Sequence, residues 1–273
     1  MSALELVVIG VAGVLAGAIN TIVGAGTLLT FPLLVGVGVP PLTANVSNTV
    51  GLVPAAVTGA WGYRTELAGM WGVVARMAAL SAVGGVVGAG LVLVAPPDTF
   101  TLVVPWLLVL AAGLAAAQPR IAERLRRREN LAALASGLTL DEEEPPADFV
   151  AKITRPLSVG LALGILATGV YGGYFGAAQG VVLLAMLGTW WSADLHRANG
   201  AKVVLAGMAN LVGALIFAFS GEVDWVIAAL IAVGSAVGGV IGARVGRRIP
   251  AAALRVVIVV VGLAAAVALW IRG

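Results

Sequence analysis

Two polar pairs stand at the start of long apolar stretches and could bind an anion. Asn45 and Asn48 lie three residues apart, and so do Asn199 and Lys202. Residues at this spacing share one face of a helix, so each pair can direct its donors to one place. An oxyanion accepts such hydrogen bonds and supplies the negative charge that a buried lysine needs. An alternative stays open for Lys202, whose ammonium group could instead reach the membrane interface.

Two glycine clusters, at 20–27 and 171–180, are the other candidates for chemistry. Glycine lets the backbone leave helical geometry, and the free N–H groups of the next half-helix then present a positive dipole end to an anion. The alternative is that these glycines only allow close helix packing, as we expect for Gly84, Gly85 and Gly88. The clusters add these candidate binding residues: Asn20, Gly24, Gly26, Thr27, Gly176 and Gln179.

The elements that must position these residues are membrane helices. The chain has 273 residues, of which 60% are hydrophobic and 11% charged, with a mean hydropathy of +1.06. Apolar runs of about 20 residues recur, which is the length that crosses a bilayer as a helix. They are expected at 3–22, 26–39, 44–62, 70–94, 100–117, 157–175, 178–190, 198–219, 225–243 and 251–271.

An internal duplication relates the two halves of the chain. The stretch 81–90 matches 235–244 at eight of ten positions, a shift of 154 residues, and Trp71 matches Trp225 at the same shift. Several landmarks that share one offset indicate a repeat. We therefore divide the chain into a first transmembrane repeat at 1–117, a charged linker at 118–155 and a second transmembrane repeat at 156–273.

The distribution of basic residues predicts how the repeats are oriented. If 3–39 and 157–190 each fold back at their glycines, fifteen of the 16 Lys and Arg residues share the side of the linker, against ten if each is a single span. The positive-inside bias favours the first layout, with the linker in the cytoplasm. The fold expected is an all-α integral membrane protein. It has two inverted repeats of about five apolar segments each, with short or re-entrant broken helices at the start of each repeat.

Catalysis has no support in the sequence. Cysteine is absent, and no metal-ligand cluster, activated nucleophile, Walker loop or dinucleotide fingerprint is present. We therefore expect no enzymatic activity, no metal, no cofactor and no nucleic acid. The expected partners are a small inorganic or organic anion and the lipid bilayer of the cell membrane, and a homo-oligomer stays open.

The stretch from Asn20 to Pro32, followed by 43–49 and echoed around Gly176 and Asn199, resembles the TauE/SafE sulfite exporter-like proteins. The second bend departs from the glycine-richer Gly-x-Gly-Gly form of that family. The resemblance implies transport of sulfite, sulfonates, thiosulfate or other small anions. We expect a secondary transporter that works by alternating access, and the alternative is an anion-selective channel.

Overall fold

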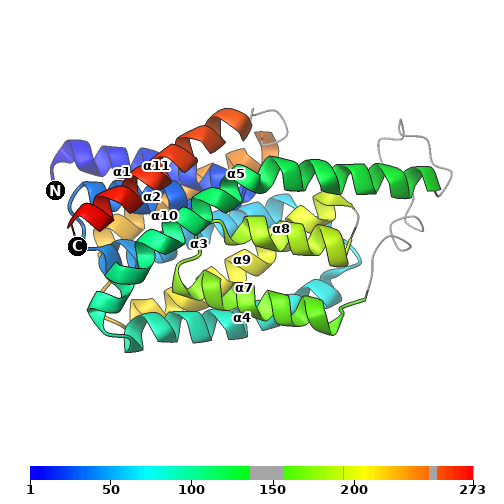
Figure 1. Cartoon of the computed structure of the whole chain (residues 1–273), viewed down its shortest axis with the longest axis horizontal. Helices are drawn as coiled ribbons and strands as arrows, with labels where there is room; N and C mark the ends of the chain where they lie inside the picture. The colour runs from blue at the N-terminus through cyan, green and yellow to red at the C-terminus, as the bar shows by residue number, and fades with distance from the viewer. Residues whose placement is uncertain (136–155, 193, 246–250, 273) are drawn as a thin grey trace.

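In the residues that it describes, the computed structural model is a bundle of ten helices whose axes mostly follow its long dimension (Figure 1). It describes residues 1–135, 156–192, 194–245 and 251–272, and no β-strand occurs among them. The helices are α1 (Ala3–Ile22), α2 (Thr27–Gly36), α3 (Pro41–Gly62), α4 (Trp71–Val94), α5 (Pro97–Ala135), α7 (Val159–Tyr174), α8 (Gln179–Trp190), α9 (Leu195–Ala218), α10 (Trp225–Val245) and α11 (Ala251–Arg272).

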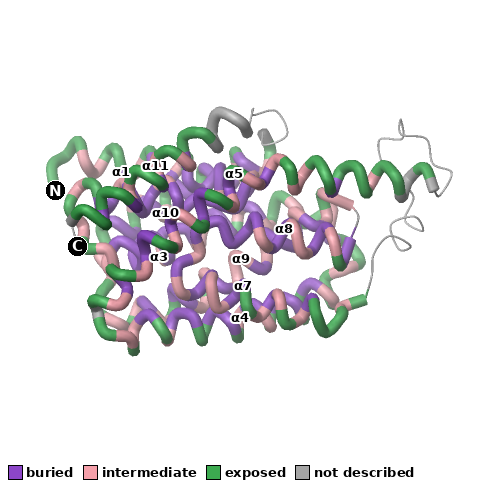
Figure 2. Tube along the Cα trace, viewed as in Figure 1, coloured by how far each residue is buried: buried purple, intermediate pink, exposed green. Residues whose placement is uncertain are grey.

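The predicted all-α membrane class is confirmed. Each helix falls on one of the ten expected apolar segments, and in the described residues five helices are long and apolar enough to cross a bilayer: α1, α4, α5, α9 and α10. Buried residues fill the centre of the bundle, while exposed ones face outward (Figure 2). Many outward residues are large and apolar, such as Val94 and Phe219, which suits lipid as the surrounding solvent.

Helix α5 is longer than its apolar segment predicts. It continues for 39 residues to Ala135, through the arginine-rich part of the expected linker, and extends past the other helices (Figure 1). The helix continues through Pro119, which stands just after the apolar run, because Arg, Glu, Leu and Ala beyond it are strong helix formers. The rest of the linker, 136–155, lies outside the described residues.

The two halves interlock through their fourth helices. Helix α4 packs against α7 and α9 of the second half, and α10 packs against α1 and α3 of the first. The Ser81 hydroxyl donates to the Leu205 carbonyl at 2.8 Å, and the Ser235 hydroxyl donates to the Gly51 carbonyl at 2.6 Å. Both serines and both acceptors are related by the same shift of 154 residues, so the repeat extends to tertiary contacts.

Glycine allows these helices to approach until their backbones touch. A Cβ atom added to Gly84 would lie 2.3 Å from the Leu166 carbonyl oxygen, and one added to Gly238 would lie 2.0 Å from that of Val14. Both distances are far below van der Waals contact, so larger residues would push the helices apart. This is the close packing expected of small residues between membrane helices.

Candidate functional site

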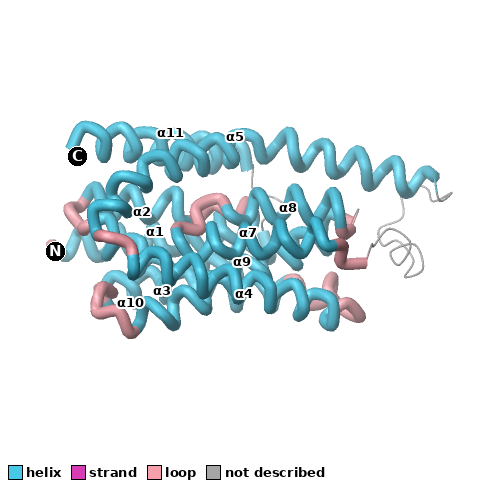
Figure 3. The backbone as a smooth tube through the Cα atoms, turned by 60° about the horizontal axis from the view of Figure 1, so that its bottom comes forward, coloured by secondary structure: helices cyan, strands magenta, loops and turns pink. Residues whose placement is uncertain are grey.

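Both repeats open with a broken helix. Helix α1 ends at Ile22 and α2 begins at Thr27, while α7 ends at Tyr174 and α8 begins at Gln179. A loop stretch therefore lies inside the bundle as well as at its two ends (Figure 3). Each bend contains a glycine in the left-handed region, Gly24 at φ 81° and Gly176 at φ 72°. Side chains other than hydrogen are strained at such angles, so these two positions need glycine.

The two bends touch each other through their backbones. The Gly180 N–H, at the start of α8, donates to the Gly24 carbonyl at 3.2 Å. A Cβ atom on Gly24 would lie 2.5 Å from the Cα of Gly180, and one on Gly180 would lie 2.6 Å from the Cα of Gly24. The positive end of α8 therefore faces the first bend directly.

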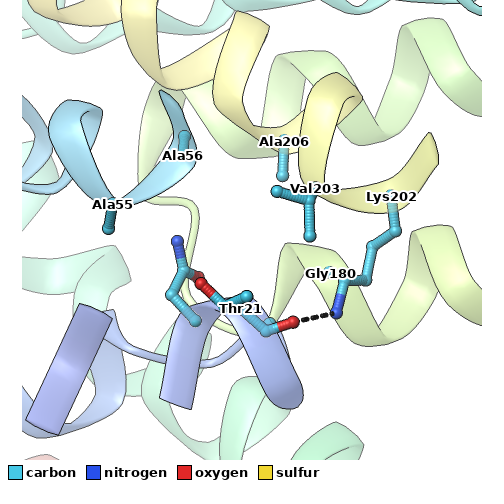
Figure 4. A pocket seen from close by; sticks show the side chains of 9 residues that line it. Thr21, Ala55, Ala56, Gly180, Lys202, Val203 and Ala206 are labelled. Atoms are coloured by element: carbon cyan, nitrogen blue, oxygen red, sulfur yellow. Dashed lines mark hydrogen bonds between the residues drawn. The ribbon is translucent and has the colours of Figure 1, made fainter. Parts of the chain in front are cut away.

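Lys202 reaches this contact from α9 (Figure 4). Its side chain is only 1% exposed, and its ammonium donates to the carbonyls of Thr21 at 3.1 Å and Ile22 at 3.3 Å. These carbonyls end α1, where the helix dipole is negative and favours a cation. The lysine therefore turns into the protein and does not extend to the interface.

A small cavity lies beside the ammonium group. Its volume is about 10 Å³, which is room for about one water molecule. The lining residues are Asn20, Thr21, Gly24, Ala55, Ala56, Gly180, Lys202, Val203 and Ala206. Alanines and a valine from α3 and α9 form one wall (Figure 4). Since an oxyanion is larger than water, it would enter only if the walls separate.

At the second bend an amide takes the place of the ammonium. Ile22 and Tyr174 end equivalent helices, and the amide nitrogen of Asn45 donates to the Tyr174 carbonyl at 3.0 Å. The side chain of Asn45 is fully buried, and its Oδ1 has no hydrogen-bond partner in the described part of the chain. Each broken helix is thus capped by a polar side chain from the other half.

The polar candidates Asn48 and Gln179 form hydrogen bonds between neighbouring helices near the bends. The amide nitrogen of Asn48 donates to the Thr27 hydroxyl at 3.3 Å, and its oxygen accepts from the Thr30 hydroxyl at 2.5 Å. The amide nitrogen of Gln179 donates to the Thr168 carbonyl at 2.9 Å. These contacts satisfy buried polar groups between helices, as a membrane interior requires.

The sequence-predicted residues are therefore only partly brought together. Asn20, Gly24 and Lys202 line the cavity, and Gly26 lies within the first bend. Asn199 is separate from it, because its amide nitrogen donates to the Tyr63 hydroxyl at 2.6 Å.

Sequence reasoning missed the small apolar wall residues Ala55, Ala56 and Ala206, which carry no polar signal. It also missed Asn210, whose Oδ1 lies 3.5 Å from the position of a Cβ atom on Gly176. Its position in an apolar segment was the one signal that could have found it.

The electrostatics of the site are set by one group. Among the buried residues that the structure describes, Lys202 is the only one that carries a charge. Its buried neighbours are neutral amides, hydroxyls and backbone carbonyls. A buried cation that lacks an acidic partner attracts an anion, and the carbonyls provide only partial compensation.

Comparison with known proteins places this architecture in a family. Residues 9–269 match the family model described as "Sulfite exporter TauE/SafE". The chain is 24% identical over 238 residues to "Probable membrane transporter protein YfcA" of Escherichia coli K12, covering 86% of this chain and 78% of that protein. It is 27% identical over 229 residues to "Probable membrane transporter protein ORF9" of a Sinorhizobium species, covering 82% and 76%.

No solved structure matches the chain. The family match spans both repeats, and the relatives are named as membrane transporters. The chain is therefore a multi-pass membrane transporter that belongs to the sulfite exporter TauE/SafE family.

Proposed function

We propose that the protein is a secondary transporter of a small sulfur oxyanion, such as sulfite or an organosulfonate, across the cytoplasmic membrane. The observation that carries the proposal is the buried ammonium of Lys202 beside a cavity where two broken helices meet. Converging helix ends and polar groups at the middle of a bundle are typical of substrate sites in transporters with inverted repeats. The family is named for sulfite exporters, which supports sulfite or a related anion as the cargo.

The anion would bind by replacing the carbonyls as the partner of Lys202. Without a ligand, the ammonium donates to the carbonyls of Thr21 and Ile22, which partly compensate its positive charge. An entering oxyanion accepts a charge-assisted hydrogen bond from the ammonium, which is stronger than the bond to a neutral carbonyl. Asn20, which lines the same cavity, adds an amide donor, and the start of α8 adds its dipole.

Alternating access would then come from the interlocked halves. The cavity is too small for an oxyanion, so binding requires α3 and α9 to move away from the bends. We propose that the halves are inverted and rock against each other, with 118–155 in the cytoplasm, as the distribution of basic residues favours. Thr27, Asn45, Asn48, Gly176 and Gln179 keep the bends in shape during that motion, and Asn199 bonds the first part of α9 to Tyr63.

Uptake of labelled sulfite into proteoliposomes tests this proposal. The parent protein should show saturable uptake and counterflow, whereas Lys202→Met should lose uptake even when uptake is normalised to folded protein. Asn199→Ala is the matched control, because it removes a polar group of the same helix that does not line the cavity. Equal uptake by Lys202→Met and the parent would reject the site, and single-channel current without counterflow would indicate a channel.

A further inference from the structure

We infer that the site selects singly charged oxyanions over doubly charged ones, because the core provides one unit of positive charge. This inference rests on the proposed function and specifies the class of anion that the same site takes. A bound sulfite would therefore be the hydrogensulfite form. Simple alkanesulfonates, which carry one permanent charge, would be equally suitable cargo.

The first step is the charge of the buried core. Lys202 is the only charged side chain among the buried residues of the described ranges. A monoanion beside it makes a neutral pair, whereas a dianion leaves one negative charge buried without a partner. Such a charge is very costly in a membrane interior, and the nearby carbonyl oxygens of Thr21 and Ile22 add to the repulsion.

The second step is that the duplication does not supply a second cation. The shift of 154 residues places Asn48 at the position equivalent to Lys202. Asn48 is neutral, is 1% exposed, and has both ends of its amide bonded to threonine hydroxyls. At the equivalent helix end, the Tyr174 carbonyl is bonded by the neutral Asn45. The two bends therefore contribute one positive charge between them.

The third step is that the nearby arginines are engaged elsewhere or face outward. Arg197, on the same helix as Lys202, forms an ion pair with Asp194 at 3.3 Å and donates to the Met70 sulfur at 2.9 Å. Arg64 lies over the Trp61 ring at 4.8 Å and is exposed, as is Arg76. None of these three guanidinium groups lines the cavity.

Competition with anions of fixed charge tests the inference. Uptake of labelled sulfite into proteoliposomes is measured against methanesulfonate, a permanent monoanion, and sulfate, a dianion at neutral pH. One uncompensated charge should weaken the binding of sulfate by at least about tenfold relative to the binding of methanesulfonate. Sulfate that competes as well as methanesulfonate would overturn the charge selection and leave the transporter proposal intact. No sulfite uptake under any condition would instead refute the proposed function, and the inference with it.

A pH series provides the second measurement. As the pH rises and hydrogensulfite loses its proton, the apparent KM for total sulfite should increase as the hydrogensulfite fraction falls. The inhibition constant Ki of methanesulfonate should stay constant, because its charge does not change. A constant KM for total sulfite would overturn the inference. A parallel loss of methanesulfonate binding would also overturn it, because the titrating group would then belong to the protein.

Discussion

The first and second bends share one backbone design but differ in what surrounds it. Each has a glycine in the left-handed region and a terminal carbonyl bonded by a side chain from the other half. The first bend meets a lysine and a cavity. The second is surrounded by aromatic rings, with Phe175 edge-on to Phe31 at 5.2 Å. A duplicated element can therefore keep its geometry in both copies while only one copy retains room and charge for a ligand.

The rigidity of the second bend follows from its partners. Phe175 also packs on Phe100 at 6.4 Å, and the Tyr171 hydroxyl donates to the Ala177 carbonyl. Aromatic pairs and buried hydrogen bonds stabilise one conformation. We therefore expect transport to depend on the side chains around the first bend and not on those around the second, and four changes compare the two halves.

Exchanging the two equivalent polar residues should have the largest effect. Lys202→Asn removes the buried cation and should reduce sulfite uptake by at least about 30-fold, as expected when one partner of a buried charge pair is lost. Adding Asn48→Lys should not restore uptake, because position 48 is enclosed by Thr27 and Thr30 and does not line the cavity. Proteoliposome uptake measures both variants. Recovery in the double variant would show that the bends are interchangeable.

Replacing Gly24 and Gly176 by alanine should distinguish the cost of left-handed backbone strain from the cost of steric overlap between the bends. Gly24→Ala should cost about 3 kcal/mol or more in the free energy of unfolding, because left-handed strain is added to overlap with Gly180. Gly176→Ala should cost only about 1–2 kcal/mol, because its nearest contact for a Cβ atom is 3.0 Å away.

Thermal unfolding in detergent measures both glycine variants. Gly36→Ala is the control, since a Cβ atom there meets nothing within 4 Å and the helix should be unaffected or slightly stabilised. Equal losses for Gly24→Ala and Gly176→Ala would mean that contact between the bends contributes nothing.

Asn45→Ala should affect stability more than transport. The change leaves the Tyr174 carbonyl without its donor and should cost about 1–3 kcal/mol. Sulfite uptake per folded molecule should fall less than tenfold, since Asn45 does not line the cavity. The measurements are thermal unfolding and uptake normalised to folded protein. A loss of uptake as large as that of Lys202→Asn would place the ligand at the second bend as well.

The two equivalent serines should give the smallest and most similar effects. Ser81→Ala and Ser235→Ala each remove one hydroxyl-to-carbonyl hydrogen bond between helices, which is worth about 0.6–1 kcal/mol in a membrane protein. Thermal unfolding of the two variants should give nearly equal shifts. Unequal shifts would show that the halves have diverged in packing as well as in their bends.

Sequence patterns predicted the helices and part of the site for clear physical reasons. Apolar runs of sufficient length predict the membrane helices, and the glycine clusters predict where the two helices are broken. Lys202 and Asn20 were identifiable because a polar group inside an apolar membrane segment costs free energy and therefore usually has a functional role. The hydrogen bond from Asn199 to Tyr63 was not, since it joins residues 136 apart and depends on tertiary packing. The continuation of α5 was missed because hydropathy shows where the apolar stretch ends but not where the helix ends.

That long helix has a mechanical consequence. A rod of 39 residues is about 58 Å long at 1.5 Å per residue, and its far part projects beyond its neighbours. Near that part, the Arg128 guanidinium donates to the Thr189 carbonyl and the Glu129 carboxylate accepts from the Leu195 N–H. If the rod stays straight, a tilt of about 10° at one end displaces the other by roughly 10 Å. A small rotation of α5 within the bundle would therefore move its far end much more than its near end, unless the helix bends at its internal prolines, Pro105 and Pro119.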